Sequence, residues 1–325
     1  MSYKTFFYFL ILSFSFLNAD PLVDPLASWN EGPRKMAILT FIKETTEEGE
    51  NYIAPEARIA TFDQDGTLWV EHPLYVQSFF ALDRVKALAS SHPEWKNQEP
   101  YKAILNGDLE KIKTFTKKEM IEIVFATHSG MSIDAFHETV RNWLKVAVHP
   151  RFKKPFTSLV YQPMREVMEL FEAHGYKNYI VSGGGQEFIR ATSKELYHLM
   201  PDRILGTAGK VKYEWREGDP QLLKMPAILL VDDKAGKPEM INLLIGQRSV
   251  AAFGNSDGDR EMLQWTSTNP NGKRLAMLVH HDDPIREYAY GPDTKIGTFS
   301  DSLMEEAIAQ HWGVISMKED WKTIF

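Results

Sequence analysis

The sequence predicts an α/β fold: a Rossmann-like parallel sheet with helices on both faces and an all-helical cap inserted after the first strand. Short apolar runs that end in glycine or acidic residues, such as residues 58–62, alternate with helix-period segments, which is typical of a parallel sheet covered on both faces. Residues 74–158, by contrast, have a helical pattern throughout. We therefore assign residues 20–73 and 159–325 to the α/β core and residues 74–158 to a helical cap domain.

The predicted elements follow from local periodicity and from breaker residues. In the cap, Phe136, Val140 and Trp143 fall on one face of a helix over residues 133–148. In the core, a helix that begins at Met164 is expected to end before Gly175, because glycine readily adopts the left-handed conformation that closes helices. The predicted helices span residues 34–44, 74–89, 120–126, 133–148, 164–174, 187–199, 238–245, 258–265 and 303–311, and the predicted strands span residues 58–62, 179–181, 203–205, 210–215 (a hairpin arm), 227–231, 249–253 and 275–279.

Composition narrows the classes of function. The chain has 325 residues, of which 43% are hydrophobic and 25% are charged, as in ordinary globular proteins. A formal net charge of −7 without a block rich in lysine and arginine argues against nucleic-acid binding, which depends on neutralising phosphates. A local cationic pocket could still bind a small phosphate ester. Cysteine is absent, which excludes disulfides, thiol catalysis and thiolate metal sites.

The N-terminus predicts a signal peptide over residues 1–19. Lys4 supplies a positive charge, the stretch from Phe6 to Leu17 is uncharged and apolar, and Ala19 follows as a small residue. The stretch is shorter than the ~20 apolar residues of a transmembrane helix. We expect an exported protein, periplasmic or secreted, without stable membrane insertion after cleavage. Leu17 at the −3 position leaves the cleavage site open, and an uncleaved N-terminal anchor is the alternative.

The first chemical motif follows the first predicted strand. Asp63 and Asp65 lie just past that strand, and ligand sites of open α/β sheets lie at the carboxyl ends of the strands. Two carboxylates at this spacing suit a division of labour, in which one attacks and binds a cation and the other exchanges protons. Gly66 permits a turn, and the Thr67 hydroxyl can brace the loop. The alternative interpretation is an acidic surface turn.

Three further segments supply the groups that a phosphate site needs. Ser182 with the following glycines offers a hydroxyl and backbone N–H groups between a strand and a helix, which suits an anion. Lys237 stands at a helix start and could neutralise a phosphate, with Lys234 as the alternative. The loop at residues 254–259 offers the oxygen ligands that Mg²⁺ prefers. Each segment also has a purely structural interpretation. The serine and glycines could form a tight turn, the lysines could be solvated, and the acidic residues of the loop could cap a helix.

Taken together, these motifs resemble a known family. Asp-x-Asp-Gly-Thr at residues 63–67, Ser-Gly-Gly at residues 182–184, a lysine at residue 237 and Gly-Asn-Ser-Asp-x-Asp at residues 254–259 occur in this order. The order resembles the four motifs of the haloacid dehalogenase superfamily. The helical insert directly after the first motif looks like the cap of the phosphoserine-phosphatase-like branch of that superfamily. The resemblance covers nearly the whole mature chain.

The resemblance implies a Mg²⁺-dependent phosphomonoester hydrolase that acts through an aspartyl-phosphate on small phosphorylated metabolites. Asp63 would attack phosphorus, and Asp65 would protonate the leaving oxygen and later activate water. Ser182, the Gly183 amide and Lys237 would hold the phosphoryl oxygens. Mg²⁺ would be held by a carboxylate oxygen of Asp63, the backbone carbonyl of Asp65 and a side chain of the last motif.

One position departs from the family pattern. Many relatives carry aspartate directly after the glycine of the last motif, whereas this chain has Asn255. Asparagine can offer a carbonyl oxygen to Mg²⁺, but without charge. Either Asn255 is the ligand and Asp259 supports it through water, which we favour, or the loop shifts and Asp257 is the ligand.

Substrate selection is expected to belong to the cap and to the segment that leads into it. Glu71 and His72 stand where the chain leaves the core, near the expected pocket mouth, and relatives use a glutamate close to this position for substrate or gating contacts. His128 and Arg141 are weaker candidates. Residues 280–283, His-His-Asp-Asp, end another predicted strand; they could hold a second metal ion, but a role in substrate contact or loop packing is favoured.

Two other functions remain open at this level. A phosphotransferase would use the same chemistry and pass the phosphoryl group to an alcohol. A non-catalytic exported binding protein on a degenerate scaffold is the third possibility, for which Asn255 is the best argument and the retained pair of Asp63 and Asp65 the best counter-argument. The sequence specifies neither the natural substrate nor the oligomeric state.

Overall fold

The computed structural model describes residues 24–216, 218–270 and 272–325. Its centre is a seven-stranded sheet in the order β4-β3-β2-β1-β5-β6-β7. All neighbouring strands are parallel except β3 and β4, which form an antiparallel pair. The strands are β1 Ile59–Phe62, β2 Lys177–Gly185, β3 Ile204–Arg216, β4 Asp219–Leu230, β5 Ala251–Gly254, β6 Leu275–His280 and β7 Gly313–Ser316. The predicted α/β class with a mostly parallel sheet is confirmed.

Helices cover both faces of this sheet. Consecutive strand residues contribute to opposite hydrophobic clusters: Ala252 belongs to one and Phe253 to the other, as the alternation of side chains along a strand requires. Phe253 stacks on Phe62 of β1, with ring centroids 4.7 Å apart, and Phe171 packs edge-on against both rings. The core helices are α1 Pro33–Thr46, α7 Gln162–Ala173, α8 Gln186–Arg190, α9 Ser193–Tyr197, α10 Gly236–Leu244, α11 Arg260–Ser267, α12 Asp301–Ala309 and α13 Met317–Asp320, with 3-10 turns at Pro55–Ala57, Phe156–Ser158 and Pro201–Arg203.

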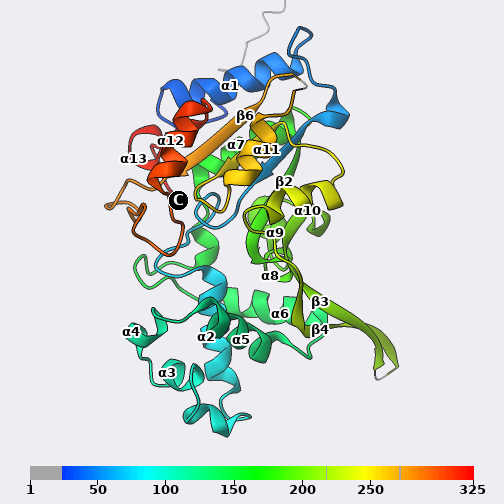
Figure 1. Ribbon diagram of the computed structural model, residues 1–325, viewed down its shortest axis with the longest axis vertical. Helices are drawn as coiled ribbons and strands as arrows, with labels where there is room; N and C mark the ends of the chain where they lie inside the picture. The colour runs from blue at the N-terminus through cyan, green and yellow to red at the C-terminus, as the bar shows by residue number, and fades with distance from the viewer. Residues whose placement is uncertain (1–23, 217, 271) are drawn as a thin grey trace, which may run out of the picture.

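A helical cap lies between β1 and α7 in the sequence and forms the lower part of the molecule in Figure 1. It has a hydrophobic cluster of its own, which includes Val85, Trp95 and Ile123. Its helices are α2 Val76–Leu88, α3 Tyr101–Leu105, α4 Leu109–Ile112, α5 Lys117–His128 and α6 Ile133–Leu144, with a 3-10 turn at Pro93–Lys96. Helices α2 to α6 all lie within residues 74–158, where the sequence has a helical pattern.

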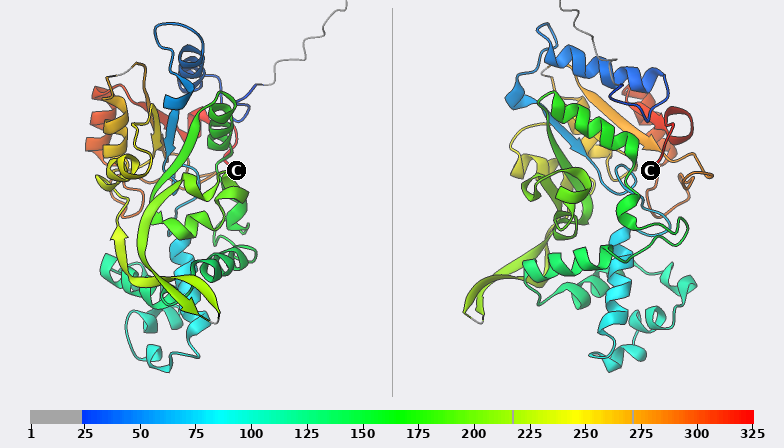
Figure 2. Two further views of the ribbon diagram at one scale, coloured as in Figure 1. Left: turned by 90° about the vertical axis from the view of Figure 1, so that its right-hand side faces the viewer. Right: turned by 180° about the vertical axis from the view of Figure 1, so that it is seen from behind.

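The β3–β4 hairpin leaves the sheet and reaches the cap (Figure 2). Its return strand contacts the cap through backbone hydrogen bonds, because Gly130 N donates to Lys224 O at 2.8 Å and Lys224 N donates to Met131 O at 2.9 Å. The hairpin is thus a second connection between core and cap, besides the segments on either side of the cap.

Several element predictions need correction. Residues 227–230 of the predicted separate strand 227–231 end the antiparallel arm β4, and Leu229 and the following Val231 are 61% and 45% exposed. An apolar run of this length can form either a buried strand or an edge strand, and the sequence alone does not distinguish the two. Residues 203–205 and 210–215 form one strand, β3, and the predicted helix 187–199 divides into α8 and α9 at Thr192, whose φ is −135°. Strand β7 and helix α13 were not predicted.

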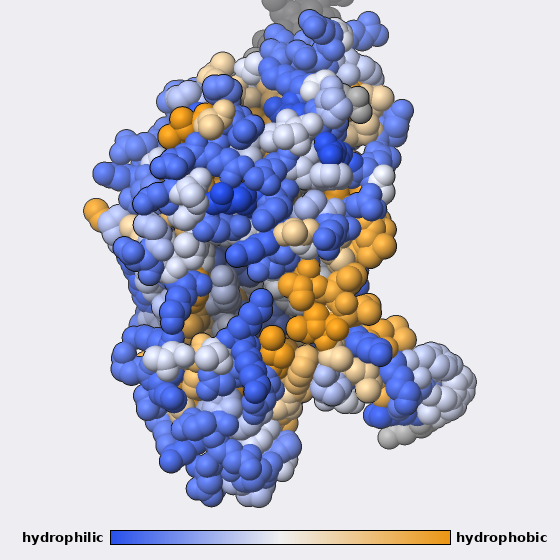
Figure 3. All heavy atoms as spheres, viewed as in Figure 1, coloured by the Kyte–Doolittle hydropathy of each residue, from blue (hydrophilic) through white to orange (hydrophobic). Residues whose placement is uncertain are grey.

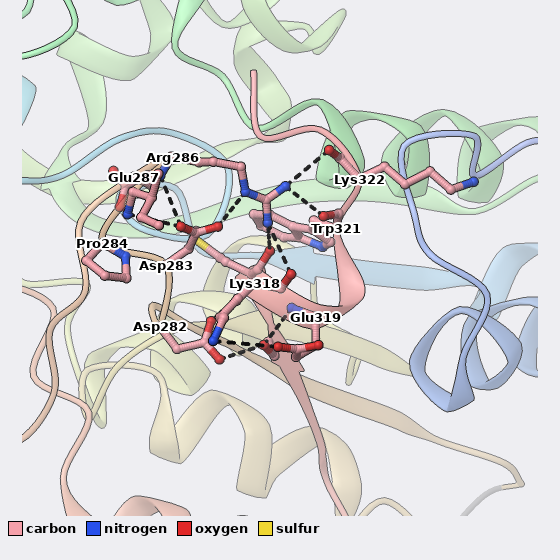
Figure 4. Close-up of polar contacts among 12 residues, drawn as sticks. Asp282, Asp283, Pro284, Arg286, Glu287, Lys318, Glu319, Trp321 and Lys322 are labelled. Carbon is pink, nitrogen blue, oxygen red and sulfur yellow. Dashed lines mark hydrogen bonds and ion pairs between the residues drawn. The ribbon is translucent and has the colours of Figure 1, made fainter.

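The C-terminal segment is fastened to the loop after β6 (Figure 4). Arg286 forms an ion pair with Asp283 and donates to the backbone carbonyls of Met317, Lys318, Trp321 and Lys322 at 2.7–3.2 Å. These bonds fix the end of the chain against the sheet. The predicted signal peptide, residues 1–19, lies outside the described residues. Within the described part of the chain, no helix combines the length and apolarity needed to cross a membrane.

Candidate active site

Lys237 links the ends of three core segments at the carboxyl edge of the sheet. Its ammonium donates to Asp63 Oδ1 and Asp259 Oδ1, each at 2.6 Å, and to the carbonyl of Val181 in β2 at 2.8 Å. The backbone N–H of Asp63 continues the ladder from β1 by donating to Phe253 O at 2.9 Å. Lys237 is only 2% exposed, so these contacts form in a largely water-free interior. Of the two candidate lysines, it is Lys237 that lies against Asp63.

The two aspartates of the first motif have different surroundings. Burial and the nearby Asp259 carboxylate raise the pKa of Asp63, while the Lys237 ammonium opposes this shift. Burial raises the pKa of Asp65 to about 7, and Lys237 opposes this only in part. Burial would lower the pKa of Lys237, but the charges of Asp259 and Asp63 outweigh it and raise that pKa. Asp65 can therefore carry a proton near neutral pH beside a cation held against Asp63.

The Ser182–Gly185 segment is not the strand-to-helix turn that the sequence suggested. It completes β2, with a register shift against β3 between Ser182 and Gly185, and α8 begins only at Gln186. Ser182 Oγ accepts a hydrogen bond from Gly184 N at 3.1 Å, and Gln77 Oε1 of the cap accepts one from Gly185 N at 2.7 Å. The irregular strand end thus brings Ser182 and its glycines to the same edge as Asp63, and Gln77 joins them from the cap.

Asp259 organises the loop of the last motif. Its Oδ2 accepts from the backbone N–H groups of Asn255, at 2.9 Å, and Ser256, at 3.0 Å, while its Oδ1 accepts from Lys237. Asp257 points elsewhere, since it accepts from the Ser300 hydroxyl at 2.7 Å. Asn255 is buried, and its Oδ1 accepts from the Thr67 hydroxyl at 3.2 Å. Of the two alternative ligands, Asn255 is the one that lies beside the first motif.

Glu71 is built into this arrangement rather than exposed at a pocket mouth. It is 2% exposed, and its Oε1 accepts from Asn255 Nδ2 at 2.7 Å and from the Tyr290 hydroxyl at 2.5 Å. Burial raises its pKa, and the hydrogen bonds from Tyr290 and Asn255 oppose the shift. Gly66 and Gly297 both have positive φ, and a Cβ on them would lie 2.3 Å and 1.9 Å from Glu71 Oε1. Only glycine leaves room for the glutamate at these two positions.

The histidines near the site have structural contacts. His72 stacks on Tyr290, with ring centroids 3.9 Å apart, and hydrogen-bonds Ile296 O at 3.1 Å; the described residues that line the cavity do not include it. His281 Nε2 donates to Gly66 O at 2.7 Å and so supports the first motif from behind. His280 packs on Phe299. Asp282 and Asp283 bind the C-terminal segment and Arg286. The His-His-Asp-Asp segment thus holds neighbouring loops in place, in line with the favoured interpretation of substrate contact or loop packing.

Tyr290 and Gln77 are the residues that the sequence did not point to. Tyr290 comes from the loop after β6 and fixes Glu71, and Gln77 comes from the first turn of α2 and holds the Gly185 N–H. Neither stands in a motif or directly after a predicted strand, so the chain carries no local signal for them. His128, a weaker candidate, is buried against Phe80 and Phe136.

The oxygen donors around Thr67 fit a hard cation. The Thr67 hydroxyl lies 3.2 Å from Asn255 Oδ1 and 3.4 Å from Asp63 Oδ2, so these two oxygens stand on the same side of the loop. In the part of the chain that the structure describes, no group of three His, Cys, Asp or Glu side chains could hold a metal ion. A carboxylate, an amide oxygen and backbone carbonyls, completed by water, are a set that suits Mg²⁺ rather than zinc.

A cavity of about 380 Å³ opens from these residues toward the cap. Figure 3 shows the hollow between the upper and lower parts of the molecule, with apolar side chains beside it at the base of the β3–β4 hairpin. Its polar end contains Asp63, Asp65, Glu71, Ser182, Gly183 and Lys237. Charged and hydrogen-bonding groups from four sequence-distant motifs therefore meet at one end of a single cavity.

Comparison with known proteins places this geometry in a family. The family model described as haloacid dehalogenase-like hydrolase matches residues 60–264, more than half of the chain. The chain belongs to this hydrolase family. The match begins within β1 and ends in α11, so it contains all four motifs, and the predicted superfamily is confirmed. No curated protein matches the sequence.

The chain is also similar to solved structures, and one with a TM-score above 0.5 agrees with it in fold. A conserved, functionally unknown protein from Anaerococcus prevotii DSM 20548 is 15% identical with a TM-score of 0.51, and the match covers 77% of this chain and 86% of that one. A protein with unknown function from Bordetella pertussis Tohama I is 17% identical with a TM-score of 0.47, over 79% and 97%. A phosphoserine phosphohydrolase-like protein from Francisella tularensis SCHU S4 is 15% identical with a TM-score of 0.37, over 69% and 88%.

Proposed function

We propose that this hydrolase is a Mg²⁺-dependent phosphatase that cleaves phosphomonoesters through a phosphorylated Asp63. The observation that carries the proposal is the pairing of two carboxylates with one buried cation. Asp63 Oδ1 lies 2.6 Å from Lys237 Nζ, and burial raises the pKa of Asp65, two residues on, to about 7. One carboxylate is thus oriented at the end of the cavity, and the other can hold a proton at neutral pH.

The proposed reaction has two steps. In the first, a carboxylate oxygen of Asp63 forms a bond to phosphorus, the bond from phosphorus to the ester oxygen breaks, and Asp65 gives its proton to that leaving oxygen. In the second, Asp65 takes a proton from water, the water oxygen attacks phosphorus, and the bond to Asp63 breaks to release inorganic phosphate. Ser182, the Gly183 N–H and Lys237 would hold the phosphoryl oxygens in both steps, because all three line the same end of the cavity.

Mg²⁺ would be held by Asp63, Asn255 Oδ1 and the backbone carbonyl of Asp65, with Asp259 supporting the loop. When bound, the ion would neutralise negative charge on the phosphoryl group and on Asp63. Asn255 adds no charge to this site, whereas an aspartate would add one. Glu71 Oε1, 2.7 Å from Asn255 Nδ2, orients the amide whose oxygen would bind the ion.

We expect this site to bind a small-molecule phosphate ester and not a nucleic acid.

We propose that the protein acts after export, in a periplasm or outside the cell, on the strength of Lys4, the apolar stretch from Phe6 to Leu17, and Ala19. Expression of the full chain with separation of the exported fraction, followed by N-terminal sequencing of the product, tests this. Recovery of the full chain, with Met1, only in the cytoplasmic fraction would contradict it.

The test of the activity uses p-nitrophenyl phosphate with and without Mg²⁺. Turnover that requires Mg²⁺ and is abolished in Asp63→Asn supports the proposal. Asp257→Asn is the matched control, because it makes the same change in a side chain that binds Ser300 and not the cavity end, and it should retain activity. No turnover at any pH with any divalent ion would leave a binding protein. Product analysis with added glycerol separates hydrolysis from phosphoryl transfer.

A further inference from the structure

The cavity continues well beyond the groups that the phosphoryl chemistry needs. From Asp63 and Ser182 it extends between helix α5 of the cap and strand β4 of the hairpin. Its volume of about 380 Å³ lies within the range of ~300–1,000 Å³ typical of small-molecule pockets. The far end of the cavity therefore has room for the part of a substrate that is not phosphate.

Helix α5 presents an apolar face to this space. Met120, Ile121, Val124 and Phe125 line the cavity, at the spacing that places residues on one side of a helix. Ile123, on the other side, packs in the cap's own core. Among the described residues, Ile121 and Phe125 belong to none of the three hydrophobic clusters. Their apolar surface is not used to hold the cap together and faces the cavity instead.

Strand β4 forms the opposite wall with side chains of the same kind. Met225 and Ile228 of the strand and Val231, directly after it, line the cavity, and Ile228 and Val231 are 38% and 45% exposed. Figure 3 shows apolar side chains gathered where the hairpin leaves the core, next to the hollow. Two apolar walls that face each other across a water-accessible space are a surface that an apolar ligand group would cover.

The charged side chains at the far end of the cavity have partners in its walls or lie at its rim. The Lys224 ammonium lies over the ring of Phe136, 4.3 Å from its centroid. Glu187 accepts from Arg190 at 2.9 Å and from His137 at 2.8 Å. Lys117 is exposed at the rim. Glu71, at the phosphoryl end, accepts hydrogen bonds from Tyr290 and Asn255. At the far end of the cavity, an ammonium group of a substrate would thus meet the Glu187 carboxylate, which already has two donors.

We propose that the substrate is a phosphomonoester whose alcohol carries an apolar body, an alkyl chain or a ring, seated between the α5 and β4 walls. This inference rests on the proposed phosphatase function and names its substrate class. Each CH₂ group buried in such a space should raise affinity about two- to fourfold until the cavity is filled. A polar alcohol such as that of phosphoserine or glycerol phosphate would gain nothing from these walls and would leave its own polar groups poorly solvated.

The test measures chain-length dependence in two ways on the full protein with Mg²⁺. The first is kcat/KM for ethyl, butyl and hexyl phosphate, whose leaving alcohols are chemically alike. The second is calorimetric binding of methyl, butyl and hexyl phosphonate, which cannot be hydrolysed, so binding is measured independently of turnover. Both should strengthen with each CH₂ group, and hexyl phosphonate binding should show a negative heat-capacity change. O-phosphoserine should be a poorer substrate than hexyl phosphate by at least about tenfold.

Variants locate the effect. Phe125→Ala should flatten the chain-length dependence, with a larger loss on hexyl than on ethyl phosphate. Leu109→Ala is the control, because Leu109 is an exposed leucine of the same cap that lies outside the cavity, and it should match the unmodified protein. Turnover without chain-length dependence, or preference for O-phosphoserine, would overturn the inference and leave the phosphatase function standing. Chain-length-dependent phosphonate binding without any turnover would overturn the phosphatase function, and the cavity would then be a binding site for apolar phosphate compounds and not a substrate site.

Discussion

The side-chain amide of Asn255 donates from Nδ2 to Oε1 of Glu71 at 2.7 Å, and this bond determines which way the amide faces. With its nitrogen committed to Glu71, the amide turns Oδ1 toward the Thr67 hydroxyl and the Asp63 side of the loop. Tyr290 holds the same glutamate oxygen from the opposite segment. A neutral residue thus presents an oxygen to the candidate metal site, and the glutamate behind it fixes the orientation of that oxygen.

Replacing Glu71 by glutamine should weaken Mg²⁺ binding. A glutamine amide can accept or donate toward Asn255, so the Oδ1 of Asn255 is no longer held toward the site. Removal of such an outer partner of a metal ligand typically costs about 10- to 100-fold in metal affinity. Calorimetric titration with Mg²⁺ measures the loss directly. Glu56→Gln, an exposed site with the same change, should bind as the unmodified protein does. Equal affinity in Glu71→Gln would show that the contact does not orient a ligand.

Replacing Asn255 by aspartate should make folding stability depend strongly on Mg²⁺. Without the ion, the new carboxyl group would face Glu71 Oε1 across the present 2.7 Å contact, and the loss of the amide donor between two buried acids should cost about 2 kcal/mol of unfolding free energy. With the ion, the added charge should tighten binding and recover that loss by linkage. Thermal unfolding with Mg²⁺ and with EDTA should show a larger difference in Tm for the variant. The same difference in both proteins would place the ion away from residue 255.

The pH dependence of turnover should depend on the leaving group. Because burial raises the pKa of Asp65 to about 7, the acid is present below that pH and is lost as the pH rises through it. An alkyl alcohol needs that proton, so kcat for hexyl phosphate should fall about tenfold per pH unit above the pKa. p-Nitrophenolate leaves without full protonation and should be less sensitive. Comparison of the two pH profiles measures this, and parallel profiles would argue against Asp65 as the acid.

The sequence predicts the residues at the carboxyl edge of the sheet better than it predicts the walls of the cavity. Asp63, Ser182, Lys237 and Asn255 could be brought together from sequence because each follows a strand or begins the next helix, and parallel strands end at one edge. Tyr290 has no such signal: it reaches Glu71 from a loop, through a contact that depends on tertiary packing.

Strand β4 shows the other limit of sequence reasoning. Residues 227–231 have the composition of a buried strand, and they were predicted as a separate strand. In the structure they end an antiparallel arm with exposed aliphatic side chains, which composition cannot distinguish from a buried one. For the same reason the sequence did not predict that the apolar surface of this arm forms a wall of the cavity and is not part of the core.

Arg286 should matter for the stability of the C-terminal segment. Its guanidinium group forms an ion pair with Asp283 and donates to the backbone carbonyls of Met317, Lys318, Trp321 and Lys322 (Figure 4). The single ammonium group of a lysine cannot make all of these contacts. Arg286→Lys should lower the unfolding free energy by about 1–2 kcal/mol. Urea unfolding measures the change, together with the rate at which a carboxypeptidase removes Phe325.

The control for Arg286→Lys is Lys318→Ala. It removes a side chain that is 63% exposed from the same segment and leaves the four carbonyl bonds in place, so it should leave both stability and digestion rate unchanged. If Arg286→Lys were as stable as the unmodified protein, the backbone bonds of the arginine would not be what fastens the chain end.

His128 should make the cap sensitive to acid. Burial, reinforced by the charges of Lys224 and Arg84, lowers the pKa of this imidazole to about 3, compared with 6.5 in an unfolded chain. The folded state therefore favours the neutral ring, so its contribution is complete above pH 6.5 and is lost as the pH falls toward 3. Between pH 7 and pH 5 this one group should reduce the unfolding free energy by about 2 kcal/mol.

Replacement of His128 by phenylalanine isolates that contribution. The ring stacks on Phe80, with centroids 5.2 Å apart, so phenylalanine preserves the packing while removing the titrating group. Urea unfolding at pH 7 and pH 5 should show a smaller loss of stability on acidification for His128→Phe than for the unmodified protein. His92→Phe, which removes a half-exposed imidazole from the same cap, is the comparison for a ring outside the buried cluster. An identical loss in His128→Phe and the unmodified protein would mean that the buried ring takes up its proton without opening the cap.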